Sequence, residues 1–322
     1  MSRSNSVDRQ LEELDALAAS LPAPDATAQL RRHLGSRSNV VVARAARLAA
    51  SVADEELESA LVAAFRRFMT DAAKTDRGCL GKLAIVEALR ALGDADPDVL
   101  RAGLRHVQPE PTWGGQADTA APLRAACALG LVEVGDAEIL DDLAVLLADP
   151  EADARLGAAR ALAACGPLAT PLLRFKALSG DAQPLVTAEC LGGLMSIAPE
   201  ESFDFVADLI DPARPEVAPH AAMALAESHA PEAFALLMRK WEEAFLPELR
   251  RELLLPIGLT RHQDAPDFLL GVLAAADLAT GTAAIAALAI YKGDPGMAER
   301  ARAAVGGRHR DRLLSVLEQA FR

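Results

Sequence analysis

Apolar residues recur along the chain at steps of three and four, the spacing of a helix with one buried face. Residues 139–147 (ILDDLAVLL) and 203–210 (FDFVADLI) show the pattern clearly. The first of these segments is followed by Asp149 and Pro150, and Asp can cap the next helix while Pro fits its first position. The pattern therefore predicts successive amphipathic helices joined by short, capped turns.

A second pattern, a run of small residues ending in a large aliphatic one, marks an internal repeat. Clear copies stand at 125–129 (AACAL), 158–162 (AARAL) and 221–225 (AAMAL). The aliphatic anchors are Leu48, Leu89, Leu129, Leu162, Leu191, Leu225, Ile257 and Leu288, separated by 29 to 41 residues. This period is typical of a solenoid in which each repeat is one helical hairpin, and the anchor lies in its second helix.

Residues 146–162, with LLADP, Ala154-Arg155 and AARAL in turn, resemble the HEAT-like repeat of phycobilin lyase subunits and bacterial scaffold proteins. The resemblance extends over 35–305. It implies an all-α fold, a right-handed α-solenoid of roughly eight HEAT-like helical hairpins with capping helices. Because one architecture serves many activities, the resemblance predicts the fold better than the function.

We expect residues 7–322 to form a single solenoid, with an N-terminal cap over 7–34 and a C-terminal cap helix over 306–322. Residues 1–6 are expected to be disordered. The repeats are lengthened at 70–79 and at 108–117, and the second of these insertions is rich in Pro and Gly. Pro256 is expected to interrupt the helix that carries the anchor at 257, since proline removes a helical hydrogen bond.

Composition and charge narrow the possible functions. Aromatic residues make up only 4% of the chain, so Ala, Leu and Val must form the core. The net charge is −13; residues 1–110 contribute −1 (15 basic, 16 acidic) and residues 111–322 contribute −12 (18 basic, 30 acidic). An acidic body argues against nucleic acid as a partner. No apolar run reaches the roughly 20 residues of a membrane span and no apolar leader is visible, so we expect a cytoplasmic, bacterial protein with reduced cysteines.

No motif predicts catalysis, a metal or a cofactor. Residues 76–83 (DRGCLGKL) end like a phosphate-binding loop, but Asp76 replaces its first Gly and Leu83 replaces the hydroxyl residue that binds magnesium. The sequence has no His-Glu dipeptide, which HEAT-like di-iron hydroxylases repeat. Glu216 and His220 share a helix face, yet a solvated or helix-end histidine explains them better than a metal site.

The sequence favours a protein-interaction scaffold or adaptor that binds a partner segment, another protein or peptide, in the concave groove of the solenoid. An enzyme or ligand carrier similar to bilin lyases is the alternative, although no aromatic residue occupies the positions two before each anchor. The candidate partner-binding residues near the anchors are Arg124, Arg160, Glu189, His220, Met223 and Leu255. The last two could instead pack against a neighbouring helix.

Two tryptophans complete the candidates. Trp113 lies in the 108–117 insertion, and an exposed tryptophan is a frequent interface hot spot; a tryptophan folded back over a repeat junction is the competing interpretation. Trp241 stands at helical spacing from Met238 and Phe245, which predicts a core residue. The identity of the partner and the oligomeric state do not follow from these patterns.

Overall fold

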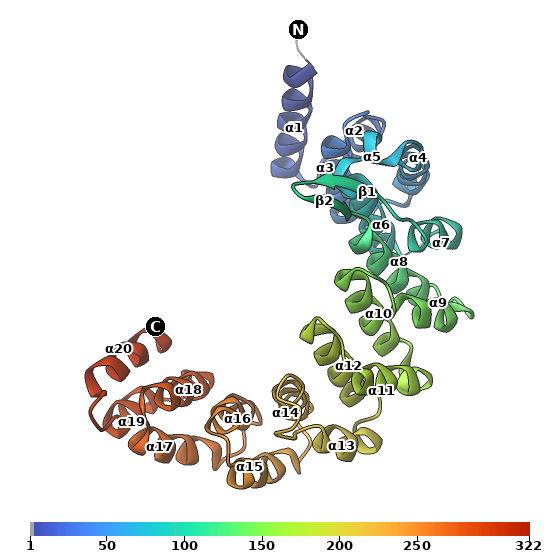
Figure 1. Cartoon of the computed structure of the whole chain (residues 1–322). Helices are drawn as coiled ribbons and strands as arrows, with labels where there is room; N and C mark the ends of the chain where they lie inside the picture. Colours follow the sequence, from blue (N-terminus) through green and yellow to red (C-terminus); the bar gives the residue numbers. More distant parts are fainter. Residues whose placement is uncertain (1–2, 94) are drawn as a thin grey trace. The chain divides into compact units, whose positions relative to one another are not determined.

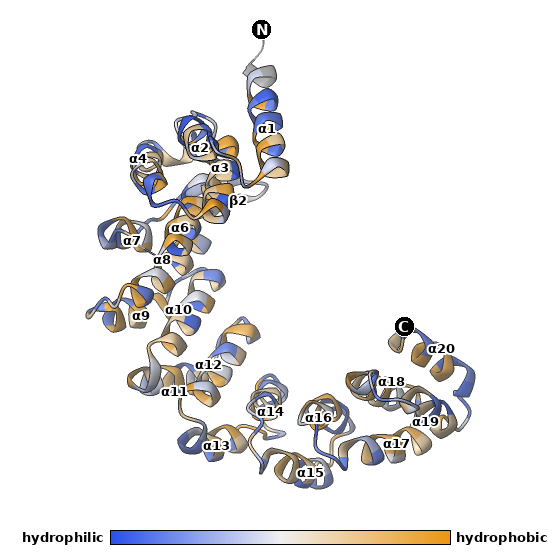
Figure 2. Ribbon diagram, turned by 180° about the vertical axis from the view of Figure 1, so that it is seen from behind, coloured by the Kyte–Doolittle hydropathy of each residue, from blue (hydrophilic) through white to orange (hydrophobic). Residues whose placement is uncertain are grey.

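The computed structural model describes residues 3–93 and 95–322 and confirms the all-α, helical-hairpin repeat fold. Its contacts divide the chain into two compact units, Met1–Cys165 (unit 1) and Gly166–Arg322 (unit 2), where the sequence analysis expects one solenoid. Most helices carry hydrophilic and hydrophobic residues on different sides, as on α1 and α20 in Figure 2. Each buries one face against its neighbours, as the three- and four-residue spacing predicts.

Unit 1 contains the first half of the repeats (Figure 1). Its helices are α1 (Arg3–Ser20), α2 (Ala26–Leu34), α3 (Asn39–Val52), α4 (Glu58–Met69), α5 (Ala72–Thr75), α6 (Leu80–Leu92), α7 (Pro97–Leu104), α8 (Ala121–Glu133), α9 (Ile139–Leu146) and α10 (Ala152–Ala164), with short 3-10 turns at Glu55–Leu57 and Arg77–Cys79. Two strands, β1 (Pro109–Thr112) and β2 (Gly115–Asp118), precede α8. Helix α1 begins at Arg3, within the segment 1–6 for which disorder is expected; residues 1–2 lie outside the described part.

The second helices of the repeats pack in series in unit 1. Helices α3, α6, α8 and α10 contact one another in that order, and α2, α4, α7 and α9 pack beside them. The spacing between α8 and α10 is especially small, because a Cβ added to Gly157 would lie 2.2 Å from the Cβ of Ala125. Small residues in the repeat therefore permit close helix packing, which explains the Ala-rich pattern.

Unit 2 continues the same arrangement. Its helices are α11 (Thr170–Ser179), α12 (Pro184–Ile197), α13 (Pro199–Asp208), α14 (Ala218–Glu227), α15 (Ala233–Glu243), α16 (Pro247–Leu259), α17 (Ala265–Ala275), α18 (Leu278–Leu288), α19 (Met297–Ala304) and α20 (Arg310–Ala320), with 3-10 turns at Gly166–Ala169 and Ala289–Tyr291. Helices α12, α14, α16, α18 and α20 contact in series, and α11, α13, α15, α17 and α19 form the second layer (Figure 1). All predicted anchors lie in the second helices of their repeats.

Pro256 does not end its helix, contrary to the sequence prediction. Helix α16 continues through it to Leu259, and Pro256 itself is buried. Because proline has no N–H, the carbonyl of Glu252 loses the donor that an unbroken helix would supply. The packing of α16 between α14 and α18 compensates for this loss, and the Pro256 carbonyl still accepts from the N–H of Thr260, 3.1 Å away.

Three of the cysteines, Cys79, Cys127 and Cys190, are buried, and Cys165 is half-buried; all four are free thiols. Burial raises the pKa of Cys79 and of Cys190 to about 12, so both stay protonated at neutral pH. They behave as small core residues rather than as nucleophiles. Among the described residues, no helix is both long enough and apolar enough to cross a membrane.

Candidate functional site: a clamped hairpin that presents a tryptophan

The 108–117 insertion folds as a β-hairpin, which the sequence analysis does not predict. Strands β1 and β2 pair antiparallel, with Pro109 opposite Asp118 and Thr112 opposite Gly115. Trp113 and Gly114 form the turn, and Gly114 adopts a φ of 102°, a left-handed conformation that glycine tolerates without strain. Trp113 lies at the tip with a relative exposure of 106%, so its side chain touches nothing in the described chain that shields it.

Polar side chains hold the base of the hairpin. The Oε1 atom of Glu110 accepts from the Gly78 N–H (2.7 Å), from Nε2 of Gln108 (2.6 Å) and from the Thr119 hydroxyl (2.9 Å). Asp118 accepts from the N–H groups of Gln108 (2.8 Å) and Ala120 (2.9 Å). Gln108 and Glu110 are buried, and these contacts join the hairpin to the α5–α6 turn and to the start of α8.

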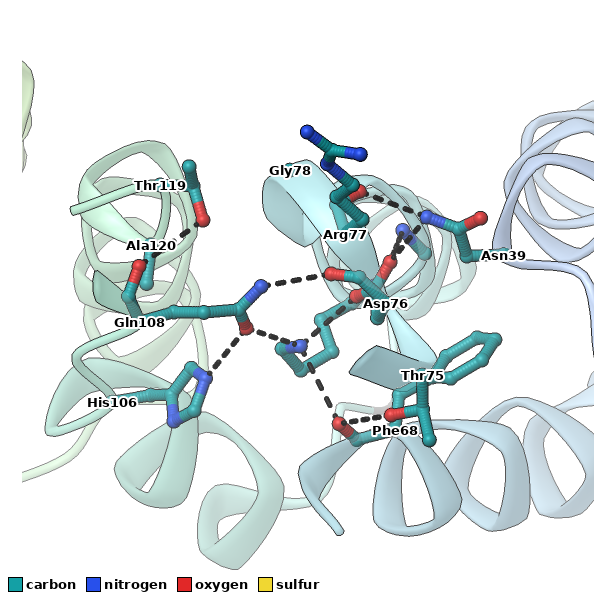
Figure 3. Close-up of polar contacts among 12 residues, drawn as sticks. Asn39, Phe68, Thr75, Asp76, Arg77, Gly78, His106, Gln108, Thr119 and Ala120 are labelled. Carbon is teal, nitrogen blue, oxygen red and sulfur yellow. Dashed lines mark hydrogen bonds and ion pairs between the residues drawn. The ribbon is translucent and has the colours of Figure 1, made fainter. Parts of the chain in front are cut away.

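At the centre of the cluster is an ion pair between Lys82 and Asp76, and both side chains are fully buried; Figure 3 labels Asp76. The Nζ atom of Lys82 lies 3.0 Å from Oδ2 of Asp76 and donates to Oε1 of Gln108 at 2.8 Å. Gln108 in turn donates from Nε2 to the backbone carbonyl of Asp76 at 2.8 Å. His106 lies 3.0 Å from the same Gln108 oxygen, and because that oxygen only accepts, the Nε2 of His106 carries the proton.

The resemblance of residues 76–83 to a phosphate loop has a structural explanation. Oδ1 and Oδ2 of Asp76 accept from the N–H groups of Gly81 (2.7 Å) and Lys82 (2.9 Å) in the first turn of α6. The N–H groups at a helix N-terminus and a nearby lysine are the parts that bind an anion. Here the Asp76 carboxylate is that anion, so the site is filled from within the chain and has no room for a phosphate.

Arg124 belongs to the same cluster, which corrects its assignment as an exposed groove residue. It is buried, and its Nη1 donates to Oδ2 of Asp118 (2.6 Å) and to the carbonyl of His106 (2.9 Å). Its Nε and Nη2 donate to the two carboxylate oxygens of Asp149, at 2.9 and 2.8 Å. Asp149 also accepts from the Glu151 N–H in the turn before α10. Arg124 therefore joins the hairpin base to the next repeat and is not available to a partner.

Hydrogen bonds within the cluster offset the cost of burying its charged carboxylates. Burial would raise the pKa of Glu110, but the donors on Gln108, Gly78 and Thr119 outweigh it and lower that pKa. Burial also opposes ionisation of Asp118, whose pKa is lowered by the Gln108 and Ala120 N–H groups and by Arg124. Burial lowers the pKa of His106, and the positive charge of Lys82 lowers it further, so this histidine is neutral at pH 7. The charged forms of both carboxylates are thus the stable ones.

We call the cluster that holds the hairpin base the clamp; it consists of Asp76, Lys82, Gln108, Glu110, Asp118 and Arg124. Most of the other predicted partner-binding residues lie outside it. Arg160 is exposed on α10. In unit 2, Glu189, His220 and Met223 are half-buried, and Leu255 is 38% exposed on α16. They come from the second helices of their repeats as expected, Arg160 in unit 1 and the other four in unit 2.

Trp241 is not a fully buried core residue, contrary to its spacing. It is half-buried and packs edge-on against Phe268, with ring centroids 4.9 Å apart, while the Arg250 guanidinium lies 5.1 Å from its ring centroid. Together they line an open hollow of about 780 Å³ that the exposed Phe245 borders. The helical spacing does not predict this opening.

Residues that sequence reasoning missed are mainly those of the ion pair. Lys82 is fully buried, and only its place in the loop-like motif at 76–83 hints at a role. Gln108 and Glu110 carry no motif, because their function depends on contacts with residues about thirty positions earlier. In the described part of the chain, no group of three His, Cys, Asp or Glu side chains is placed to hold a metal.

Comparison with known proteins adds similarity in fold only. No protein-family model and no curated protein matches the chain. One similar solved structure is the complex of CpcE and CpcF of phycocyanin lyase from Nostoc sp. PCC7120, 17% identical over 91% of this chain and 94% of that chain, with a TM-score of 0.36. Another is an engineered protein, 19% identical over 96% of this chain and 91% of that chain, with a TM-score of 0.37. At these values neither similarity bears on what this chain binds.

Proposed function

We propose that this chain is a protein-binding repeat protein and that the hairpin tip is a contact surface for the partner. The observation that carries the proposal is the position of Trp113, fully exposed at the end of a hairpin whose base is clamped by buried charges. Tryptophan is the side chain most enriched at binding hot spots, because it buries a large apolar area with few rotatable bonds. An exposed tryptophan with no structural contact has no folding benefit that would account for it.

Rigidity of the hairpin supports this interpretation. Burying an ion pair such as Lys82 and Asp76 gives little net stability, since desolvation offsets the attraction. It does fix geometry, because Gln108 contacts both members of the pair and Glu110. A hairpin held in one conformation loses less entropy on binding than a flexible loop does. The clamp therefore favours presentation of Trp113 to a partner.

The composition of the tip agrees with a protein partner. Residues 111–117 (PTWGGQA) carry no charge, although a quarter of the chain is charged. The centre of a protein interface is depleted in charged residues and enriched in aromatic ones. The Arg77 side chain beside Glu110 is strongly exposed and can supply a polar rim. The expected partner surface is an apolar pocket large enough to admit an indole ring.

Photo-cross-linking tests the proposal directly. A photoreactive phenylalanine analogue replaces Trp113 in cells that naturally produce the chain, and in a matched variant it replaces Val145, an exposed apolar residue of α9 in the same unit. We expect a discrete adduct with another protein from position 113 and none from position 145. Equal labelling from both positions, or adducts at neither, would contradict the proposal.

The alternative, an enzyme or ligand carrier similar to bilin lyases, stays a prediction. Its test is the absorbance of the purified chain after exposure to a free bilin and gel filtration. Bilin absorbance that elutes with the chain in stoichiometric amount would favour this alternative over a scaffold. Retention by a Trp113→Ala variant would then show that the ligand does not use the hairpin.

A further inference from the structure

A second surface, on α14 and α16 in unit 2, combines carboxylates with apolar side chains. We call it the acidic face; it consists of Glu216, His220, Met223 and Glu227 at and along α14, and of Glu248, Arg251, Glu252 and Leu255 along α16. Glu216 lies in the turn before α14. His220, Met223 and Glu227 on α14 are three or four residues apart, as are Glu248, Glu252 and Leu255 on α16, so each of these sets lies along one side of its helix, and Arg251 follows the same side of α16. The two helices pack against each other, which places the two sets side by side.

The rows of this face align across the two helices. His220 and Glu252 both stand five residues before their anchors and therefore occupy equivalent positions on the two packed helices. Met223 and Leu255 both stand two residues before their anchors and form the next row. Glu216 and Glu248, nine before their anchors, form a row beyond the first. The apolar row of Met223 and Leu255 therefore has carboxylates on both sides. Glu216, Glu248 and Glu252 lie toward the N-terminal ends of the helices, and Glu227 lies toward the C-terminal end of α14.

The carboxylates exceed the cations that could neutralise them. Arg251 pairs with Glu248 at 3.1 Å, and His220 is the other basic residue of the face. Within the described residues, no lysine or arginine forms an ion pair with Glu216, Glu227 or Glu252. Partial burial, reinforced by the charge of Glu248, raises the pKa of Glu252 against the opposing effect of Arg251. A carboxylate in this state gains from a cation that a partner supplies.

A hollow adjoins the face at Glu227. It measures about 350 Å³ and lies between α12 and α14, where Gly192, Ser196 and Ala224 line it beside Glu227. A Cβ added to Gly192 would meet no atom within 4 Å, so this side of α12 is open. The hollow can accept the aliphatic stem of a long side chain while its charged end reaches the carboxylate, as lysine and arginine allow.

We infer that the acidic face binds a cationic amphipathic helix of a partner protein, with the apolar stripe of that helix on Met223 and Leu255 and its lysines or arginines on Glu216, Glu227 and Glu252. The inference rests on the proposed protein-binding function but uses a different unit from the hairpin. Helix-in-groove recognition places apolar anchors every three or four residues against such a row. The charges around the row then fix the orientation of the helix and exclude acidic partners. A nucleic acid would be repelled by the same carboxylates.

The test uses designed peptides of about five helical turns, labelled with a fluorophore, and the purified full chain. One peptide has a leucine stripe and a lysine face, a second has the same composition scrambled, and a third has glutamate in place of lysine. We expect the first peptide to bind about tenfold or more tightly than either of the others, by fluorescence anisotropy. Equal binding of the scrambled peptide would overturn the inference, because charge alone would then suffice.

Paired variants locate the site. Glu227→Gln with Glu252→Gln, and separately Met223→Ser with Leu255→Ser, should each weaken binding of the lysine peptide about tenfold. The matched control, Glu200→Gln with Glu201→Gln on α13, removes the same charge from exposed positions outside the face and should leave binding unchanged. An equal loss in the control would overturn the inference, as would concentration-dependent dimerisation of the free chain that the Met223→Ser/Leu255→Ser pair abolishes. Trp113→Ala should bind the peptide normally, which separates this site from the hairpin.

Discussion

The Nζ atom of Lys82 lies 3.0 Å from Oδ2 of Asp76, and neither side chain has any exposure to solvent. The same carboxylate also accepts from the N–H groups of Gly81 and Lys82 at the start of α6. Asp76 therefore caps α6, neutralises the buried Lys82 and supports the hairpin through its backbone carbonyl, which accepts from Gln108. The consequences of this arrangement can be measured separately.

Replacement of Lys82 by Met leaves the buried Asp76 carboxylate without its cation. Removal of one partner from a buried ion pair costs about 3–5 kcal/mol of unfolding free energy. We expect Lys82→Met to lower the unfolding free energy measured by urea denaturation by this amount. Adding Asp76→Asn to Lys82→Met should lower it further by a smaller amount, because the unpaired buried charge then disappears. Lys74→Met on α5 is the control, since this exposed lysine should change stability by less than about 0.5 kcal/mol. Additive effects of the two buried substitutions would contradict the pairing.

Glu110→Gln should loosen the hairpin without unfolding the helices. The substitution replaces the charged Oε1 that accepts all three hydrogen bonds with a neutral amide oxygen, and it turns an N–H group toward Arg77 in place of Oε2. A hydrogen bond to a charged group contributes about 1.5–3 kcal/mol and one between neutral groups about 0.5–1.5 kcal/mol, so the base of the hairpin is weakened. Hydrogen exchange measured by NMR should accelerate at the strand amides of 115–118 more than in α3, whereas Glu138→Gln at an exposed site changes neither. Uniform acceleration across unit 1 would show that the carboxylate supports the whole unit instead.

Acid should weaken the clamp, and the sign follows from the lowered pKa values of Glu110 and Asp118. A carboxyl whose pKa is lowered by folding contributes stability that is fully present above its ordinary pKa, near 4. That contribution is lost as the pH falls below about 4 and through the lowered pKa. We expect the urea midpoint to drop between about pH 5 and pH 3, and to drop less in Asp118→Asn. If the urea midpoint falls equally with pH in the parent chain and in Asp118→Asn, the lowered pKa of Asp118 is not a source of the acid sensitivity.

Two glycines should respond in opposite directions to alanine. In Gly157→Ala the new methyl group collides with Ala125 at the approach of α8 and α10, where overpacking costs about 1–3 kcal/mol. In Gly271→Ala, inside α17, the methyl group meets open space, and the change should stabilise the helix by about 0.5–1 kcal/mol. Thermal melting of the two variants beside the parent chain checks both signs. A stable Gly157→Ala variant would mean that α8 and α10 separate at little cost.

The repeat architecture could be predicted from the sequence because it depends on local spacing. The anchors at 89, 162 and 225 lie buried in second helices, and Asp149, Asp181 and Asp211 accept from N–H groups two residues ahead in the turns, as their positions suggest. The effect of Pro256 could not be predicted, because packing against α14 and α18 outweighs one lost hydrogen bond.

The candidate site could be predicted only in part. Trp113 was identified from its Pro- and Gly-rich surroundings, and it is exposed. Arg124 was misplaced because its helical position suggests an exposed residue, whereas the hairpin before it and Asp149 after it enclose its guanidinium. Lys82 and Glu110 went unrecognised because the contacts that define them join segments about thirty residues apart. No local pattern records such contacts.

The binding affinity of the cross-linked partner for the parent chain and for Trp113→Ala tests the central claim most directly. Because the indole makes no shielding contact within the chain, thermal stability of the variant should equal that of the parent within about 0.5 kcal/mol. Loss of a hot-spot tryptophan costs about 2 kcal/mol or more, so the Kd should rise about thirtyfold or more. A folded Trp113→Ala variant that binds the partner with unchanged Kd would contradict the claim that the clamped hairpin is a contact surface.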